Sequence, residues 1–464
     1  MTFPLPVLSL GARNVCELLF IFGLITYLIC VSLPNDYHKS KVFVPKVEPQ
    51  TNFNHVVFGL LGSEKALHDR KHYIESWWRP NVTRGVLYLD KAPTGDLMPW
   101  SDTLLPFRVS DDLTKLLQET KARCPKNIRM VHGIMEVVRD MRDTNIRWVV
   151  MGDGDTIFFV ENIIDVLGGF DYRKYYYLGG QSEYIMANYR YSFNQGFGGA
   201  GFILSYPLAK ALASDMENCL RRYALFFASD TTTMSCIADI GVNLSPHKGF
   251  HQIDLRGDLS GFLSSHPKSP LLSLHHLDTV KPIFPVLDRH QSIRHLMEAA
   301  TADQSRILQQ TICYHKQSNW SLSISWGYSA HIYEEIMPRS YLQKPRETFK
   351  PWSPRTSRPL YMFNTRLPSN DSCHDPHVFF FEKVDKVSMG ILTTYSRANP
   401  RGLPPCSLTS QYKPDLISHI TVLSPPIKRK EMDRCECCDV VVMGGTDTSV
   451  EVKLRECGLN EVIA

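Results

Sequence analysis

The sequence predicts an α/β domain, with a mixed sheet covered by helices on both faces, followed by a β-rich domain. The composition is that of a folded protein, with 43% hydrophobic and 21% charged residues, which excludes a collagen, a mostly disordered chain and a multispanning membrane protein. Before residue 290, short apolar runs typical of strands alternate with segments whose apolar residues recur at helical spacing. After residue 290, large apolar and small residues alternate with a period of two, as in a β-strand. The net charge of +4 is too small to indicate binding to nucleic acid.

The first expected element is an apolar segment, residues 18–33, which carries no charged side chain. Extended back to Val15, it approaches the roughly 20 residues that cross a bilayer. A signal peptide is the alternative, but Pro34 makes a poor cleavage site. We therefore predict an uncleaved transmembrane signal anchor at 18–33, between a cytosolic tail at 1–17 and a stem at 34–52. The flanking basic residues do not determine its orientation.

Cysteines and glycosylation sequons favour an oxidising compartment for the rest of the chain. The sequence has 12 cysteines, and an even number remains after Cys16 and Cys30 of the apolar region. Cys435, Cys437 and Cys438 lie close together without a second pair at zinc spacing, which favours disulfides over a metal there. Asn-x-Ser/Thr sequons occur at Asn81, Asn243, Asn319 and Asn370.

Short apolar runs and helical stripes alternate through the predicted α/β domain, residues 53–290. Because strands that alternate with helices form a parallel or mostly parallel sheet, we expect helices on both faces. Strands are expected at residues 55–62, 84–90, 128–131, 147–151 and 202–205, and helices at 64–78, 134–141, 160–167, from 207 to about 220, and from 230 to about 240.

The predicted β-rich domain, residues 291–464, is expected to be a sandwich without a long helix. Its clearest strand has large apolar side chains alternating with small ones, as in a half-buried strand. These large side chains are Trp320, Leu322, Ile324, Trp326 and Tyr328, and further strands are expected at 378–384, 439–443 and 450–454. The aromatic side chains could instead stack on sugars, although such a stripe is more often a core face.

Two carboxylates follow the predicted strand at 147–151, in the run Gly152-Asp153-Gly154-Asp155. Ligands of open α/β sheets bind beyond the carboxyl ends of strands, and paired carboxylates suit Mg²⁺ or Mn²⁺ together with a phosphate group. A turn whose aspartate caps the next helix is the simple alternative.

Three further features add to this candidate site. A glycine-rich loop, Gly196-Phe-Gly198-Gly199-Ala200-Gly201, enters a predicted strand, but lacks both the Gly-x-Gly-x-x-Gly and the Walker patterns. Asp230 begins a predicted helix, where an N-cap is the simple alternative. His275 and His276 follow an apolar run, and at least one of them is expected to be an ordinary structural histidine.

Taken in order, these elements resemble the fringe-type family of β-1,3-glycosyltransferases, and more closely its plant fringe-related group, catalogued as a domain of unknown function. The resemblance implies a GT-A-like, Rossmann-type fold for residues 53–290. It also implies a type II, single-pass Golgi membrane protein with a luminal catalytic domain. The resemblance spans about residues 55–285 and is carried by Arg147-Trp148, the runs 198–202, 206–210 and 249–252, and His275-His-Leu-Asp278.

The resemblance also assigns roles to residues. It implies an inverting transfer from a nucleotide-sugar, expected to be a UDP-sugar, to a hydroxyl of a glycan or glycoconjugate, with Mn²⁺ or Mg²⁺ as cofactor. Asp230 corresponds to the general base, and Asp155 and His276 to metal ligands, with Asp153 as a possible third. The donor-binding positions are Asp153, Gly154, Asp155, Gly198, Gly199, Ala200 and Gly201.

Two departures from the family pattern leave a second hypothesis open. Gly154 stands where the family usually has the middle carboxylate of an acidic triplet, and Thr231 and Thr232 follow Asp230 where the plant group has an acid and an arginine. The alternative is a catalytically weak or inactive homologue that acts as a binding or scaffold protein in the Golgi.

Overall fold

A computed structural model describes most of the chain after residue 50. The chain divides into two compact units, Met1–Gln50 and Thr51–Ala464. The predicted tail, anchor and stem lie largely outside the described residues, and the described part of the anchor, 21–25, is helical. No described helix is long and apolar enough to cross a membrane. The described residues are 21–25, 50–141, 145–407, 412–430, 435–443 and 448–463.

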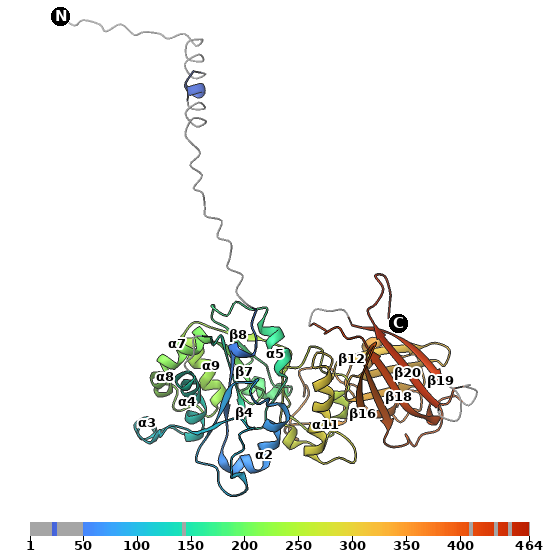
Figure 1. The fold of residues 1–464 in the computed structure, drawn as a ribbon, viewed down its shortest axis with the longest axis horizontal. Helices are drawn as coiled ribbons and strands as arrows, with labels where there is room; N and C mark the ends of the chain where they lie inside the picture. Colours follow the sequence, from blue (N-terminus) through green and yellow to red (C-terminus); the bar gives the residue numbers. More distant parts are fainter. Residues whose placement is uncertain are drawn as a thin grey trace, which may run out of the picture. The chain divides into compact units, whose positions relative to one another are not determined.

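A seven-stranded mixed sheet lies at the centre of the α/β part (Figure 1), in the order β3-β2-β1-β4-β7-β6-β8. Strands β3, β2, β1 and β4 are parallel, whereas β7 is antiparallel to both β4 and β6. The strands expected at 55–62, 84–90, 147–151 and 202–205 are confirmed. The bounds are β1 Val56–Leu61, β2 Gly85–Leu89, β3 Phe107–Val109, β4 Trp148–Asp153, β6 Tyr177–Gly179, β7 Phe202–Ser205 and β8 Leu244–Pro246.

Helices cover both faces of this sheet, as predicted. Successive strand side chains point to opposite faces, so Phe58 and Leu60 of β1 pack with α2 and α5, whereas Val57 and Leu61 pack with α4, α7, α8 and α9. The bounds are α2 Glu64–Trp77, α3 Thr114–Thr120, α4 Pro125–Asp140, α5 Val160–Leu167, α6 Ile185–Arg190, α7 Tyr206–Ser214, α8 Met216–Arg222 and α9 Ser229–Asp239.

The strand expected at 128–131 is wrong, because these residues form the first turns of α4. Pro125 occupies the first turn of this helix, where its missing N–H leaves no bond unmade. Ile128, Val131 and Ile134 are buried at intervals of one turn, so the stripe that the sequence shows from Ile134 onward begins earlier. A four-residue apolar run cannot distinguish a strand from one side of a helix.

Small sheets connect the central sheet to the rest of the unit. The strand order of the first is β5-β11-β9, and the second is the pair β10-β15. Strand β5 follows β4 after a short turn, so β11 and β9 end near the carboxyl end of β4. The bounds are β5 Ile157–Phe158, β9 Phe250–Gln252, β10 Leu255–Gly257, β11 Ser273–His275, β15 Phe349–Pro351 and α10 Ser260–Leu263.

The C-terminal part is β-rich, as predicted, but it is not a sandwich. Its eight strands form one sheet in the order β12-β13-β14-β16-β17-β18-β20-β19. The first and last strands contact each other, and the Cys313–Cys438 disulfide joins them. The bounds are β12 Gln310–His315, β13 Trp320–Ser325, β14 Ser329–Tyr333, β16 His377–Val387, β17 Gly390–Arg397, β18 Ile417–Ser424, β19 Cys437–Met443 and β20 Thr448–Arg455.

The aromatic stripe of the sequence does not form a sugar platform. Trp320, Trp326 and Tyr328 are each at most 1% exposed, and the last two lie in the turn between β13 and β14. The serines that alternate with the large side chains of β13 are also buried, and their hydroxyl groups form hydrogen bonds inside the protein. Ser321 donates to the carbonyl of Glu335, and Ser325 to that of Leu263. Both faces of β13 are therefore interior.

A helix that the sequence analysis did not predict, α11 Arg289–Ala302, joins the two parts. It contacts α2 and β16 (Figure 1), and one hydrophobic cluster contains buried side chains from both parts. The signal was present, since Asp288 and Gln291 form a capping box. The predicted boundary at 290/291 therefore falls at the start of a helix inside one compact unit.

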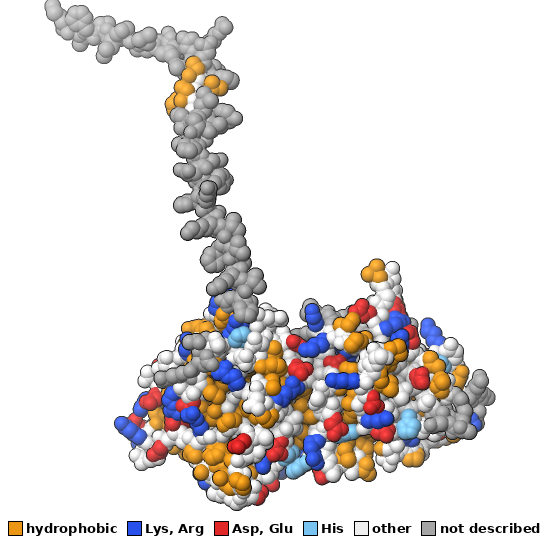
Figure 2. Space-filling model, viewed as in Figure 1, with side chains coloured by type: hydrophobic (Ala, Val, Ile, Leu, Met, Phe, Trp, Pro, Cys, Tyr) orange, Lys and Arg blue, Asp and Glu red, His pale blue; other side chains and the backbone are white. Residues whose placement is uncertain are grey.

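The surface in view carries both signs of charge. Figure 2 shows Lys and Arg side chains interspersed with Asp and Glu over the visible face of residues 51–464. Among the described residues in this view, no extended area is purely basic, in agreement with the small net charge of the chain.

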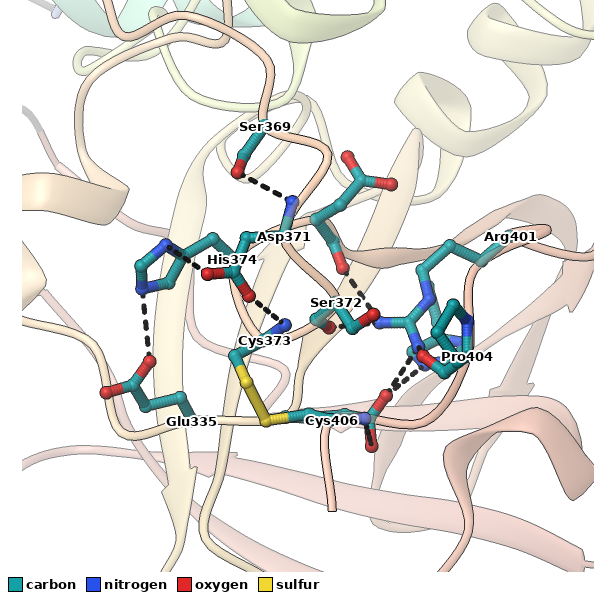
Figure 3. Close-up of a disulfide and its surroundings, with 12 residues drawn as sticks. Glu335, Ser369, Asp371, Ser372, Cys373, His374, Arg401, Pro404 and Cys406 are labelled. Atoms are coloured by element: carbon teal, nitrogen blue, oxygen red, sulfur yellow. Dashed lines mark hydrogen bonds and ion pairs between the residues drawn. A yellow bond between two sulfur atoms is a disulfide. The ribbon is translucent and has the colours of Figure 1, made fainter. Parts of the chain in front are cut away.

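Four disulfides hold described segments together, and they confirm the preference for disulfides over a metal at 435–438. Cys373–Cys406 closes a loop whose ends are also held by ionic and polar contacts (Figure 3). Asp371 accepts from the Cys373 amide, and Arg401 donates to Glu334 and to the carbonyl of Pro404. The other pairs are Cys219–Cys236, Cys313–Cys438 and Cys437–Cys457, while Cys124 and Cys435 are free.

We expect Cys313→Ala combined with Cys438→Ala to lower the free energy of unfolding by about 2–4 kcal/mol. This disulfide spans a sequence separation of 125, so its loss restores much conformational freedom to the unfolded chain. Urea denaturation of the purified full-length chain measures the change. The matched removal of Cys373–Cys406, with a separation of 33, is expected to cost about 1 kcal/mol less by loop entropy. A larger loss for the shorter loop would contradict this account.

Candidate active site

The predicted site residues meet where β4 and β11 end. Asp153 is the last residue of β4 and His275 the last of β11, and both face a cavity of about 210 Å³. Loop and helix residues from elsewhere in the chain complete its wall. Among the residues that line it are Asp153, Gly198, Gly199, Asp230, Gln252, His275 and His276.

Asp153, Asp155 and His275 form a cluster of metal-type ligands. Each offers one ligand atom, and these atoms lie within 4.8 Å of one another. The Oδ2 atom of Asp155 is buried and has no hydrogen-bond partner, so a lone pair there is available. Two carboxylates with one imidazole suit Mn²⁺ or Mg²⁺, and the residues therefore fit the divalent cation that the sequence predicts.

The protonation states of Asp153, Asp155 and His275 depend on one another. Burial by itself would raise the pKa of Asp155, but His275 and Arg70 outweigh it and lower that pKa far below its usual range. Burial raises the pKa of Asp153, an effect only partly offset by His275. Nδ1–H of His275 donates to Oε1 of Gln252 at 3.0 Å, which leaves Nε2 facing Asp155 Oδ1 at 3.4 Å.

Arg70 is a site residue that the sequence analysis missed. It lies on α2, and its guanidinium is 3.0 Å from Asp155 Oδ1 and 2.6 Å from Asp278 Oδ2. One signal was available, because Arg70 falls between Leu67 and Ile74 on the buried stripe of its helix. A charge on a buried stripe indicates a partner in the interior.

The structure places His276 next to Asp254 and not in the ligand cluster. Its Nδ1 is 2.8 Å from Asp254 Oδ1, and its ring stacks on Trp352 with centroids 4.8 Å apart. Its φ of 71° is left-handed, which is uncommon for a residue other than glycine and often marks a functional site. His276 still lines the cavity, so the two adjacent imidazoles occupy different positions in one site.

The glycine-rich loop passes so close to the cluster that side chains have no room. A Cβ on Gly199 would lie 2.1 Å from Cε1 of His275. Gly201 has a φ of +86°, a conformation that glycine adopts without strain. Thr156 connects this loop to the acidic turn, because its hydroxyl donates to the carbonyl of Gly199 at 2.7 Å and accepts from the amide of Asp153.

Asp230 lies at the start of α9, as predicted, and borders the same cavity. Its Oδ1 accepts a hydrogen bond from the amide of Gly198 at 3.1 Å. Burial within the cavity wall, together with the negative charge of Asp153, raises the pKa of Asp230 to about 7. A carboxyl with this pKa can accept and release a proton near neutral pH.

The two departures from the family pattern have different surroundings. A Cβ on Gly154 would meet no atom within 4 Å, so the position of the missing carboxylate is open space. Thr231 donates to Oε1 of Gln195 at 3.0 Å, which ties the start of α9 to the loop before Gly196. Thr232 donates to the carbonyl of Ala228, the N-cap residue of the same helix.

A second, smaller cavity adjoins Asp153 and carries positive charge. It has a volume of about 50 Å³ and is lined by Arg70, Lys126 and Arg129 as well as by Asp153 and Gly154. Gly62 and the helix N-cap Ser63 lie on its wall. Three cationic side chains beside a cluster of metal-type ligands suit an anionic group such as a diphosphate.

Two protein-family models match the chain. The model described as "Protein of unknown function, DUF604" matches residues 187–438, and the model described as "Fringe-like" matches residues 109–263. The first match runs from α6 into β19, and so crosses the predicted boundary at 290/291. No curated protein matches the chain.

Solved structures with a similar arrangement are remote. A mannosyltransferase from Pyrobaculum calidifontis in complex with GDP-Man and Mn²⁺ is 12% identical, with a TM-score of 0.28 over 44% of this chain and 59% of its own. Core-mannan synthase A from Aspergillus fumigatus, in an Mn/GDP form, is 10% identical, with a TM-score of 0.26 over 42% and 73%. Mouse xyloside xylosyltransferase 1 is 11% identical, with a TM-score of 0.25 over 44% and 86%.

The family matches confirm the resemblance to the fringe-type family and to its related domain of unknown function. They also support assignment to the glycosyltransferases. The longer match covers more than half of the residues of this chain, and the chain therefore belongs to the DUF604 family.

Proposed function

We propose that this protein is an inverting, metal-dependent glycosyltransferase with a GT-A-like donor-binding domain. It transfers a sugar from a nucleotide-sugar, expected to be a UDP-sugar, to a hydroxyl of a glycan or glycoconjugate. One observation carries this proposal. The carboxyl group of Asp230 has a pKa of about 7, and it borders the same cavity as the Asp153–Asp155–His275 cluster.

The donor side of the site is suited to a leaving diphosphate. Asp153, Asp155 and His275 would hold a divalent cation, which would supply charge neutralisation for that leaving group. Arg70 and its neighbours in the adjoining cavity, Lys126 and Arg129, bind and orient the anionic donor. Positive charge supplied locally explains how a chain of net charge +4 binds an anionic substrate.

The acceptor side of the site depends on Asp230. Above a pH of about 7, its carboxylate accepts the proton of an acceptor hydroxyl that attacks the sugar from the face opposite the diphosphate. The bond to the diphosphate breaks as the new glycosidic bond forms, and the sugar inverts. A positioned general base contributes roughly 10²–10⁴-fold to such a step.

We also propose a Golgi location, with residues 51–464 in the lumen. The asparagines of the four sequons, Asn81, Asn243, Asn319 and Asn370, are all exposed, as glycosylation requires. Four disulfides in the described residues suit an oxidising compartment. The predicted anchor at 18–33 would hold the chain to the membrane.

We expect Asp230→Asn to reduce transfer by at least about 100-fold, because the amide cannot accept the proton. In the native protein, transfer should rise as pH passes about 7, where the carboxyl ionises, and level off above it. A pH profile of kcat/KM measures both effects. Asp239→Asn, on the same helix but paired with Arg222, is the control and should keep full activity. Equal activity of Asp230→Asn would place the base elsewhere.

Measurements of metal affinity should distinguish the roles of the two adjacent histidines. We expect Asp155→Asn and His275→Gln to weaken Mn²⁺ binding at least about tenfold, since each loses a ligand or its orientation, and His276→Gln to retain it. Isothermal titration with Mn²⁺ measures the affinity, and donor hydrolysis with and without chelator measures its consequence. Loss of binding in His276→Gln alone would restore the assignment made from the sequence.

A homologue without catalysis gives a different result in the same assays. It would bind nucleotide but turn over no donor sugar, and Asp230→Asn would then change nothing. Such an outcome would favour the binding or scaffold role that the loss of the middle carboxylate at Gly154 leaves open.

Glycosylation gives a direct test of orientation. Expressed in a eukaryotic cell, the full-length chain should lose mass on treatment with peptide N-glycosidase, because its exposed sequons face the lumen. Replacing Asn81 or Asn243 by Gln should each remove one glycan, whereas Asn194→Gln, exposed but outside any sequon, should change nothing. A chain that carries no N-linked glycan would contradict the luminal placement.

A further inference from the structure

A second set of metal-type ligands lies on the side of strand β9 that faces away from the candidate active site. Gln252, the last residue of β9, lines the candidate active-site cavity, whereas the preceding residue, His251, lines another cavity of about 440 Å³. Successive residues of a strand point to opposite faces. Strand β9 therefore separates two cavities, and the second has no role in the proposed reaction.

Three side chains converge in this second cavity. Glu183, His251 and His266 each offer one ligand atom, and these atoms lie within 4.8 Å of one another. Glu183 Oε1 is 2.7 Å from His251 Nδ1, and its Oε2 is 2.9 Å from His266 Nε2. The three residues come from separate segments: the loop before α6, strand β9 and the loop after α10.

The cluster is buried and negatively charged at its centre. The side chains of Glu183, His251 and His266 are 10%, 4% and 18% exposed. Each oxygen of the Glu183 carboxylate faces a different imidazole, Oε1 that of His251 and Oε2 that of His266. An ionised carboxylate between two imidazoles is a set of ligands that needs little rearrangement to bind a cation.

One atom of this cluster lacks a partner. His251 Nε2 is buried and makes no hydrogen bond, while Nδ1 of the same ring contacts Glu183. Because Nδ1 is the nitrogen on the Glu183 side of the ring, a cation held between these two residues would be bound through Nδ1, and Nε2 would carry the proton.

We propose that Glu183, His251 and His266 bind a zinc ion, with a fourth coordination position open to the 440 Å³ cavity. Two histidines and one glutamate with an open position are a recurrent zinc set. Imidazole ligands suit Zn²⁺, whereas the two carboxylates of the Asp153–Asp155–His275 cluster suit Mn²⁺ or Mg²⁺. The two clusters would thus select different metals.

The proposed zinc would fix one wall of the active site. Glu183 donates its amide to the carbonyl of Gln252 at 3.0 Å, and the side chain of Gln252 accepts from His275. A metal that joins Glu183 to His251 would therefore hold β9, and with it the group that orients His275. Glu183, His251 and His266 are positioning residues in this scheme.

Metal content tests the proposal without reference to transfer activity. The purified full-length chain, stripped by chelator and then dialysed against micromolar Zn²⁺, should retain zinc at this site by elemental analysis. His266→Phe, which keeps an aromatic ring packed between Phe262 and Phe363, should lose one equivalent. His295→Phe is the matched control, since His295 is also 18% exposed and packs on aromatic rings, and it should keep all the zinc.

Two further measurements protect the test against a misfolded variant. Co²⁺ in place of zinc should give the intense visible absorption of a four-coordinate site in the wild-type chain and in Asp155→Asn, but not in Glu183→Gln. Zinc should also raise the melting temperature of the wild-type chain and leave that of His266→Phe unchanged. Absence of bound zinc and of the Co²⁺ spectrum in the wild-type chain would overturn the proposal. Zinc content in His266→Phe and Glu183→Gln equal to that of the wild-type chain would also overturn it.

Discussion

The buried carboxylate of Asp155 is the constraint on which the candidate site depends. A carboxylate that is 1% exposed must be paired, because an isolated buried charge is strongly unfavourable. Arg70 of α2 and His275 of β11 provide that pairing, so these two elements must meet at the end of β4. Gly199 must lack a side chain for His275 to reach this position.

Two carboxyl groups of the candidate site are held in opposite states. Asp155, beside a cationic guanidinium and an imidazole, is kept ionised, whereas Asp230, beside the negative Asp153, has its pKa raised towards neutrality. Groups whose surroundings push their pKa values apart commonly divide the roles of charge stabilisation and proton transfer. The same division supports a cation on the donor side and a base on the acceptor side.

The β-rich part is built into the α/β part and not appended to it. Helix α11 packs against both, and buried residues of α2, β16 and the eight-stranded sheet belong to one cluster. The match to the DUF604 model crosses the same boundary. The strand β13, which looks half-buried in the sequence, is buried on both faces here, and its Ser321 and Ser325 donate to carbonyls inside the protein.

The sequence by itself determined the elements whose signals are local. Apolar runs located β1, β2, β4 and β7, helical stripes located α2 and α5, and the order of motifs identified the family and placed Asp153, Asp155 and Asp230 in one site. Local patterns could not assign residues 128–131 to a helix, since a short apolar run fits either structure.

The tertiary structure decided which groups meet. It brought Arg70 to Asp155 across 85 residues of chain, and it set His275, not His276, beside the acidic pair. It also buried Trp326 and Tyr328 in a turn, and it gathered Glu183, His251 and His266 from three segments. The identity of the partner has no local signature in any of these cases, because that partner lies far away in the sequence and close only in the folded chain.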